Sequence, residues 1–154
     1  MSFRQPRAEQ IIRGEKTVDI RSWHVHYRGD LAVHASSKRR DARCRQLGFE
    51  PHKLDYGALI GLVEIVDIEP IDEAQYEALR GQHFRDTPFP GSPCYAWHVA
   101  NSRRFEEPVS YRGRMRIFYV ELDAQEEDLV PHQQSRRASY QVTAPPEPDP
   151  EHPF

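Results

Sequence analysis

Apolar residues near the start of the chain recur at helical spacing. Ala8, Ile11 and Ile12 form one stripe along a short segment. Pro6 precedes the stripe and suits the first turn of a helix, and Gly14 follows it at the position where glycine commonly ends one. The pattern therefore predicts a short first helix between Pro6 and Gly14.

Alternation of apolar and polar positions then predicts strands. Residues 17–23 alternate, with Val18 and Ile20 on one face. Further strands are expected at residues 31–36, 57–68, 94–100 and 115–122. The segment 57–68 is the most apolar, and Gly57 and Gly61 within it suit a bend or a close backbone approach.

Two more helices interrupt this series of strands. One is expected at residues 37–47, with Ser37 as its N-cap and Gly48 behind it, and the other at residues 72–80, opened by Asp72. Consecutive strands with inserted short helices indicate an α+β fold. We expect a closed or nearly closed β-barrel of five to six strands with two to three short helices.

The composition changes after Leu122. Residues 123–154 contain six prolines and hold 7 Asp and Glu against 2 Arg. Such a segment cannot bury enough apolar surface to fold alone, so we expect a domain at residues 1–122 and a largely disordered acidic tail at 123–154. The segment from Leu129 to Tyr140 is a candidate for docking on the domain.

Charge is segregated along the chain, although the net charge is only −3. Residues 1–53 hold 12 Lys and Arg against 6 Asp and Glu. A basic region of this kind is typical of a surface that meets phosphate backbones, and a solvated surface of mixed charge is the alternative.

Other features narrow the class of protein. No apolar run reaches the roughly 20 residues that span a bilayer, and the N-terminal residues lack the apolar stretch of a secretory signal. Cys44 and Cys94 lie far apart and match no metal spacing. We therefore expect a cytoplasmic protein with no membrane partner, no metal and no cofactor.

One spaced motif carries a family resemblance. Gly14, Lys16, Asp19 and Arg21 resemble the signature of the ASCH domain, in which Glu usually stands at the position of Asp19. The similarity covers about residues 3–122 and continues through the segments 27–31, 57–67, 95–97 and 103–105. The chain is similar to stand-alone ASCH proteins and to the ASCH module of a transcription coactivator.

The resemblance implies a PUA-like β-barrel with a cleft beside the first helix, lined by the signature residues. It also implies RNA or DNA as the partner, with RNA first, or a modified nucleoside. A minority of relatives are small enzymes, either hydrolases of N4-acetylcytidine or ribonucleases.

The signature residues also have a physical interpretation of their own. Asp19 and Arg21 share one face of the expected strand, and Lys16 lies at the corner before it. A carboxylate between two cations stays ionised and holds both side chains in place. The cations would then donate to a phosphate or to the edge of a base. The alternative is an ion-pair network that pins the helix to the barrel without any ligand.

Aromatic and basic residues supply further candidates for binding. Trp23, Tyr95 and Trp97 are candidate stacking platforms, although one of the pair Tyr95 and Trp97 is expected in the core, and Trp23 is the more exposed candidate. Arg39, Arg40 and Arg43 in the predicted helix 37–47 would follow a phosphate backbone or form a solvated face.

Histidines complete the set of candidate residues. His34 and Ser36 project on one strand face and would line the floor of the cleft, or His34 would be a buried, hydrogen-bonded histidine. His24 and His26 form a His-x-His pair, but no further ligand stands at an obvious spacing, so no metal site is predicted.

An enzymatic function would use Lys16 and Asp19, with Glu64 as the acidic partner. The acetylcytidine hydrolases of the family carry Thr at the position of Asp19, so the most specific catalytic element is absent. We therefore expect a binding domain first and a small hydrolase as the alternative.

Overall fold

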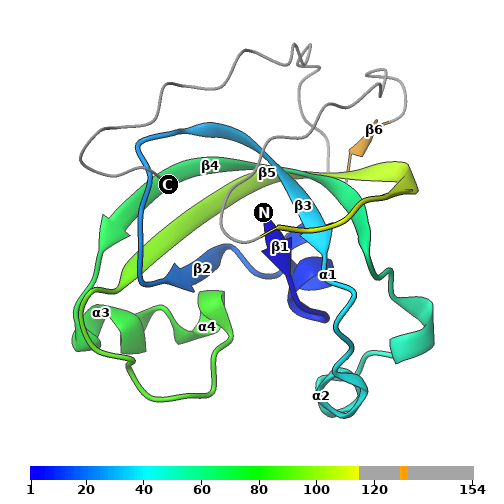
Figure 1. Ribbon diagram of the computed structural model, residues 1–154. Helices are drawn as coiled ribbons and strands as arrows, with labels where there is room; N and C mark the ends of the chain where they lie inside the picture. The colour runs from blue at the N-terminus through cyan, green and yellow to red at the C-terminus, as the bar shows by residue number, and fades with distance from the viewer. Residues whose placement is uncertain (115–128, 132–154) are drawn as a thin grey trace.

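The computed structural model describes residues 1–114 and 129–131. Its centre is a curved sheet of six strands in which the order is β1-β3-β4-β5-β2 and β6 pairs with β5 (Figure 1). The strands are β1 (Ser2–Phe3), β2 (Val18–Arg21), β3 (Gly29–Ala35), β4 (Ala58–Pro70), β5 (Tyr95–Ser110) and β6 (Leu129–Pro131). All neighbouring pairs are antiparallel except β1 and β3, which are parallel.

Short helices lie on one side of the arch that β3, β4 and β5 form (Figure 1). They are α1 (Arg7–Ile12), α2 (Asp41–Gln46), α3 (Glu73–Ala78) and α4 (Arg80–His83), with a 3-10 turn at Pro51–Lys53. In α3, Asp72 and Gln75 form a reciprocal capping box. The elements α3 and α4 lie at one end of the sheet and α2 at the other, with α1 between them. In the described ranges, no helix is long and apolar enough to cross a bilayer.

The main core lies between α1 and the inner face of the sheet. Ile11 and Ile12 of α1 pack with Ile60, Val63 and Ile65 of β4 in one buried cluster. Pairing between β4 and β5 is irregular at three places, and such bulges bend a sheet. The bent β4–β5 pair therefore curves around α1.

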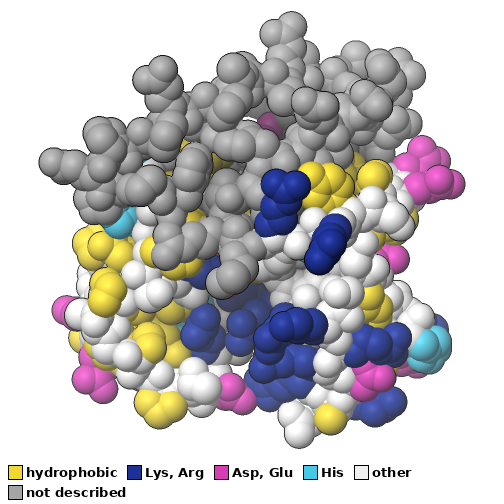
Figure 2. Space-filling view, viewed as in Figure 1, with side chains coloured by type: hydrophobic (Ala, Val, Ile, Leu, Met, Phe, Trp, Pro, Cys, Tyr) yellow, Lys and Arg dark blue, Asp and Glu magenta, His cyan; other side chains and the backbone are white. Residues whose placement is uncertain are grey.

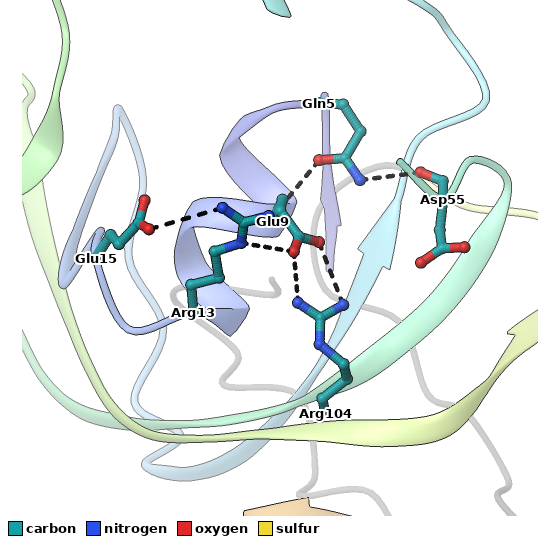
Figure 3. A network of polar contacts seen from close by, with 6 residues as sticks. All are labelled: Gln5, Glu9, Arg13, Glu15, Asp55 and Arg104. Carbon is teal, nitrogen blue, oxygen red and sulfur yellow. Dashed lines mark hydrogen bonds and ion pairs between the residues drawn. The ribbon is translucent and has the colours of Figure 1, made fainter. Parts of the chain in front are cut away.

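A buried carboxylate joins α1 to the rest of the fold (Figure 3). Glu9 accepts from Arg104 Nη2 on β5 at 2.6 Å and from Arg13 Nε at 2.9 Å. Gln5 accepts from the Glu9 amide at 3.0 Å and donates to the Asp55 carbonyl at 2.9 Å. The position of α1 is thus fixed by both apolar packing and polar contacts.

The α+β class is confirmed, but the expectation of a closed barrel is not met. Within the described ranges, β1 and β2 are the two ends of the sheet and do not pair with each other. The parallel pairing of β1 with β3 places the N-terminal residues at one edge, and the sequence offers no sign of this pairing. The sheet is therefore open.

The predicted helix at residues 37–47 is wrong in its first part. The helix α2 begins at Asp41, Arg40 is its N-cap, and Ser37 does not cap it. Cys44 is its one buried residue, and residues 37–40 are all exposed. Because helices in proteins are stabilised mainly by packing an apolar face, this polar segment gains nothing from the helical state.

The strand predicted at residues 94–100 is much longer than expected. The single strand β5 runs to Ser110 and includes Arg103, Arg104 and Phe105, which lie beyond the predicted strand. The long β4 supplies partners along this whole length, and Phe105 is buried against Leu59 and Leu62. The predicted strand 115–122 and most of the predicted tail 123–154 lie outside the described residues.

Candidate nucleic-acid interface

A cleft of about 630 Å³ opens between α1, α2 and the segment that follows α4. Residues 4–7 and Gln10 form one wall, residues 40–43 with Gln46 and Leu47 form another, and residues 83–87 form the third. Five arginines line it, namely Arg4, Arg7, Arg40, Arg43 and Arg85. Figure 2 shows Lys and Arg side chains gathered on this face between α4 and α2.

One of these arginines pairs with a carboxylate, and the other four form no ion pair among the described residues. Arg43 forms an ion pair with Asp86 at 2.9 Å, and Arg85 donates to the Ile20 carbonyl at 2.9 Å. Arg4, Arg7 and Arg40 make no ion pair with a carboxylate among residues 1–114 and 129–131. Within the described residues, the cleft therefore presents positive charge that ion pairs do not neutralise.

The pKa of Arg7 reflects this crowding of cations. Burial lowers the pKa of Arg7, and the charges of Arg85, Arg40 and Arg21 lower it further, with partial compensation from Asp19. An anion bound in the cleft would relieve the repulsion between these groups.

Beside the cleft lies the ionic triad of Lys16, Asp19 and Arg21. Asp19 is 3.5 Å from Lys16 Nζ and accepts from Arg21 Nε at 2.6 Å, so the predicted carboxylate between two cations is present. Lys16 Nζ also donates to the carbonyls of Val18 and His83, at 2.6 and 2.7 Å. The ammonium group thus has two carbonyl acceptors and one carboxylate partner within the protein.

Burial corrects the predicted role of this lysine. Lys16 is 1% exposed and Asp19 is 3% exposed. The prediction that Lys16 lines an open cleft and donates to a ligand is therefore wrong, because the amine is sealed by β2 and the His83 carbonyl of α4. Arg21 differs, because it keeps 26% of its side chain exposed beside the Phe3 ring.

His83 connects the triad to the wall of the cleft. Its Nδ1 accepts from the Arg85 amide at 2.9 Å, and its Nε2 lies 2.9 Å from the Tyr76 carbonyl. Its ring stacks on Tyr76 with 4.5 Å between centroids. Burial lowers the pKa of His83, so the neutral ring donates to Tyr76 and accepts from Arg85. The triad and His83 together set the position of Arg85.

The pKa values of the buried pair have opposing causes. Burial raises the pKa of Asp19, but the charges of Arg21 and Lys16 outweigh it and hold that pKa at about 2. Burial lowers the pKa of Lys16 to about 8, against the attraction of Asp19.

Stability should fall in acid because of Asp19. The pKa of Asp19 is lower in the folded chain, about 2, than its ordinary 3.8, so the folded state is favoured above pH 4 and loses this contribution as the pH falls through 2. The contribution is roughly 2 kcal/mol at neutral pH. Urea unfolding between pH 5 and 2 measures it, and the Asp19→Asn variant should lack that part of the decline. An equally steep decline in both proteins would contradict the assignment.

The aromatic candidates lie closer to the core than expected. Trp97 is fully buried, as predicted for one member of its pair, and donates to the Trp23 carbonyl at 3.0 Å. Trp23 meets the Trp97 ring edge-on at 4.7 Å between centroids, and both Trp23 and Tyr95 pack against the core cluster. Trp23 is therefore partly buried, although it is more exposed than Trp97, and its use as a stacking platform stays a prediction.

His34 and Ser36 line a second pocket, of about 860 Å³, that shares Arg4 with the cleft. His34 is buried, with Nδ1 2.9 Å from Ser2 Oγ and Nε2 2.6 Å from the Tyr111 carbonyl. Burial lowers the pKa of His34. His34 is thus a satisfied buried histidine, as the alternative interpretation held.

The basic residues of the predicted second helix separate into two groups. Arg40 and Arg43 line the cleft. Arg39 lies outside both pockets, where it pairs with Asp41 at 2.9 Å and covers the Tyr56 ring. Residues 37–40 are not helical, and Arg39 lies apart from the cleft, so its contact with nucleic acid stays a prediction.

Of the groups proposed for hydrolysis, Lys16 and Asp19 form an ion pair, but Glu64 lies apart from them. Glu64 alternates on β4 with Val63 and Ile65, which face the main core, so Glu64 projects from the other face of the sheet. Its partner there is Asn101. In the described part of the chain, no group of three or more His, Cys, Asp or Glu side chains could hold a metal ion.

Sequence reasoning missed Arg4, Arg7, Phe84 and Arg85 as lining residues of the cleft. Arg4 and Arg7 flank Gln5 and Pro6, so their position at the start of the first helix was a usable signal. The segment 83–87 reaches the cleft only through contacts between α4 and β2, which no local pattern encodes.

Comparisons with known proteins agree with this architecture. Activating signal cointegrator 1 from Mus musculus is 24% identical over 134 residues, which cover 79% of this chain and 22% of that protein. This chain therefore spans about a fifth of that relative's length. The crystal structure of ASCH from Zymomonas mobilis superposes with a TM-score of 0.53 at 16% identity and covers 71% of both chains.

A mutant form of the same Zymomonas mobilis protein, with phenylalanine in place of one tyrosine, gives the same TM-score of 0.53 and covers 71% of this chain and 73% of its own. At these identities the structures support the fold alone. The family model described as "ASCH domain" matches residues 1–109. The chain belongs to the ASCH domain family.

Proposed function

We propose that this chain binds nucleic acid, with RNA as the first candidate and DNA as the second, through the basic cleft beside α1. The ASCH family is associated with nucleic-acid binding. The observation that carries the proposal for this chain is the group formed by Arg4, Arg7 and Arg40. These guanidinium groups face one cleft and have no carboxylate partner within residues 1–114 and 129–131.

Phosphate is the ligand group that suits this arrangement. A guanidinium donates two parallel hydrogen bonds to phosphate oxygens, and neutralising several phosphates releases counterions from the nucleic acid. The acidic groups of the cleft do not oppose this binding strongly, because Asp41 and Asp86 already pair with Arg39 and Arg43.

The buried triad has a supporting role in this proposal. Lys16 and Asp19 join β2 to α4, and Arg85 begins the segment that forms the third wall of the cleft. We therefore assign direct contact with the ligand to Arg4, Arg7 and Arg40, and positioning to Lys16 and Asp19. We do not propose hydrolysis, because Lys16 is sealed and Glu64 lies on the other face of the sheet.

We further propose a cytoplasmic location. Cys44 and Cys94 are both buried and free, which fits a reducing compartment.

The double variant Arg7→Gln with Arg40→Gln tests the cleft. Its affinity for a single-stranded RNA oligonucleotide should fall by about 10-fold to 100-fold, because two phosphate contacts are lost. The slope of log affinity against log salt should flatten by about 0.7 for each lost contact. Fluorescence anisotropy at several salt concentrations gives both quantities.

A charge-matched control is available on the same side of the molecule. Arg45 lies on α2 and Lys53 on the 3-10 turn, both exposed and both outside the cleft. The variant Arg45→Gln with Lys53→Gln removes the same charge and should bind almost as the parent does. Equal losses in the two variants, or no loss in the cleft variant, would refute the proposed site.

A further inference from the structure

Phe84 is a partly exposed aromatic residue outside the buried apolar clusters. It follows α4 as the C-cap residue, lines the basic cleft, and is 37% exposed. Among the described residues it belongs to none of the three buried apolar clusters. A large ring therefore stands at the edge of a strongly cationic pocket, in contact with solvent.

The backbone of Phe84 strengthens this observation. Its φ of +58° and ψ of +20° lie in the left-handed region, where glycine is the usual residue at the end of a helix. A bulky L residue is disfavoured in that conformation. Stability alone would therefore favour glycine at this position, and strained residues of this kind are often found at functional sites.

Ring and charge lie on walls of the same cleft. Phe84 comes from the wall formed by residues 83–87, whereas Arg7 and Arg40 come from the two other walls. A pocket of about 630 Å³ has the size that encloses a small ligand of nucleotide dimensions. An aromatic platform beside a cationic groove is the combination by which proteins hold single-stranded nucleic acid.

We infer that the cleft takes an unpaired nucleotide of a single strand, with its base stacked on Phe84 and its phosphate held by Arg7 and Arg40. The inference rests on the proposed function and specifies its substrate. In a duplex, both faces of each base are covered by neighbouring bases, so stacking on Phe84 would require the base to leave the helix. Single strands should therefore bind more tightly than duplexes of the same sequence.

The variant Phe84→Gly separates binding from folding. It should bind a single-stranded oligonucleotide of about ten nucleotides at least about 5-fold more weakly, since one stacked base is lost. Its thermal unfolding midpoint should equal or exceed that of the parent, because glycine accepts the left-handed conformation. Phe84→Trp should keep the affinity, and Val66→Ala, which changes an exposed apolar residue on β4 outside the cleft, should have no effect.

A direct readout comes from an oligonucleotide that carries 2-aminopurine, whose fluorescence is quenched by stacking. The parent and Phe84→Trp should quench it on binding, and Phe84→Gly should not. Unchanged single-strand affinity in Phe84→Gly, or an equal loss for single strand and duplex, would overturn the inference. The Arg7 and Arg40 variants decide the proposed function separately, because they would still lose affinity if the cleft bound only backbone phosphate.

Discussion

Replacing Lys16 with methionine should lower the free energy of unfolding by about 3–5 kcal/mol, the cost of removing one partner from a buried ion pair. The change removes the donor that Lys16 provides to the carbonyls of Val18 and His83. It also removes one ion pair of Asp19, which then keeps only its ion pair with Arg21 within the triad. Each buried carbonyl left unsatisfied costs about 1–3 kcal/mol. Urea unfolding monitored by tryptophan fluorescence measures the effect.

Lys53 provides the matched control for this prediction. It also pairs with a carboxylate, Glu50, at 2.6 Å, but both side chains are exposed. Lys53→Met should change stability little, because solvent screens an exposed pair. A double-mutant cycle of Lys16→Met and Asp19→Asn should show strong coupling, since the two side chains form one network. A Lys16→Met protein as stable as the parent would contradict the role assigned to Lys16.

Binding by the Lys16 variant distinguishes support from contact. The Lys16 amine is sealed in the parent protein, so its removal should not change direct contacts with nucleic acid. Folded Lys16→Met protein, measured at low temperature, should therefore show the same slope of log affinity against log salt as the parent. A flatter slope would mean that Lys16 itself meets a phosphate. The residues alone left direct contact and an ion-pair network open, and the family resemblance favoured direct contact.

Local patterns were sufficient for the elements that bury a regular face. The stripe Ala8, Ile11 and Ile12 predicted α1, and the apolar run around Ile60 predicted β4. The spacing of Lys16, Asp19 and Arg21 also predicted their ionic contact, because residues two and three apart meet at the entry of a strand. Each of these predictions depends on neighbours close in sequence.

Long-range contacts explain what the sequence could not predict. Lys16 is sealed by the carbonyl of His83, which lies 67 positions away. The third wall of the cleft, with Phe84 and Arg85, depends on the same contact between α4 and the start of β2. The open sheet likewise depends on β1 joining β3 rather than β2, a choice made by tertiary packing. Motif spacing therefore identified the region of the site but did not reveal that Lys16 and Asp19 are buried within it.

Replacing Gly61 with alanine should destabilise the fold by about 3 kcal/mol or more, at the upper end of what overpacking costs. A Cβ at this position would overlap the backbone carbonyl oxygen of Arg103 and lie 2.9 Å from Ile12 Cδ1. The carbonyl belongs to β5 and cannot move without disturbing the pairing of Gly61 with Arg104.

Gly81 in α4 is the control, because a Cβ there meets nothing within 4 Å and alanine favours a helix by up to about 1 kcal/mol. Thermal unfolding should therefore show a large loss for Gly61→Ala and none for Gly81→Ala. Equal midpoints for Gly61→Ala and the parent would mean that β4 and β5 do not approach as closely as the bent sheet around α1 requires.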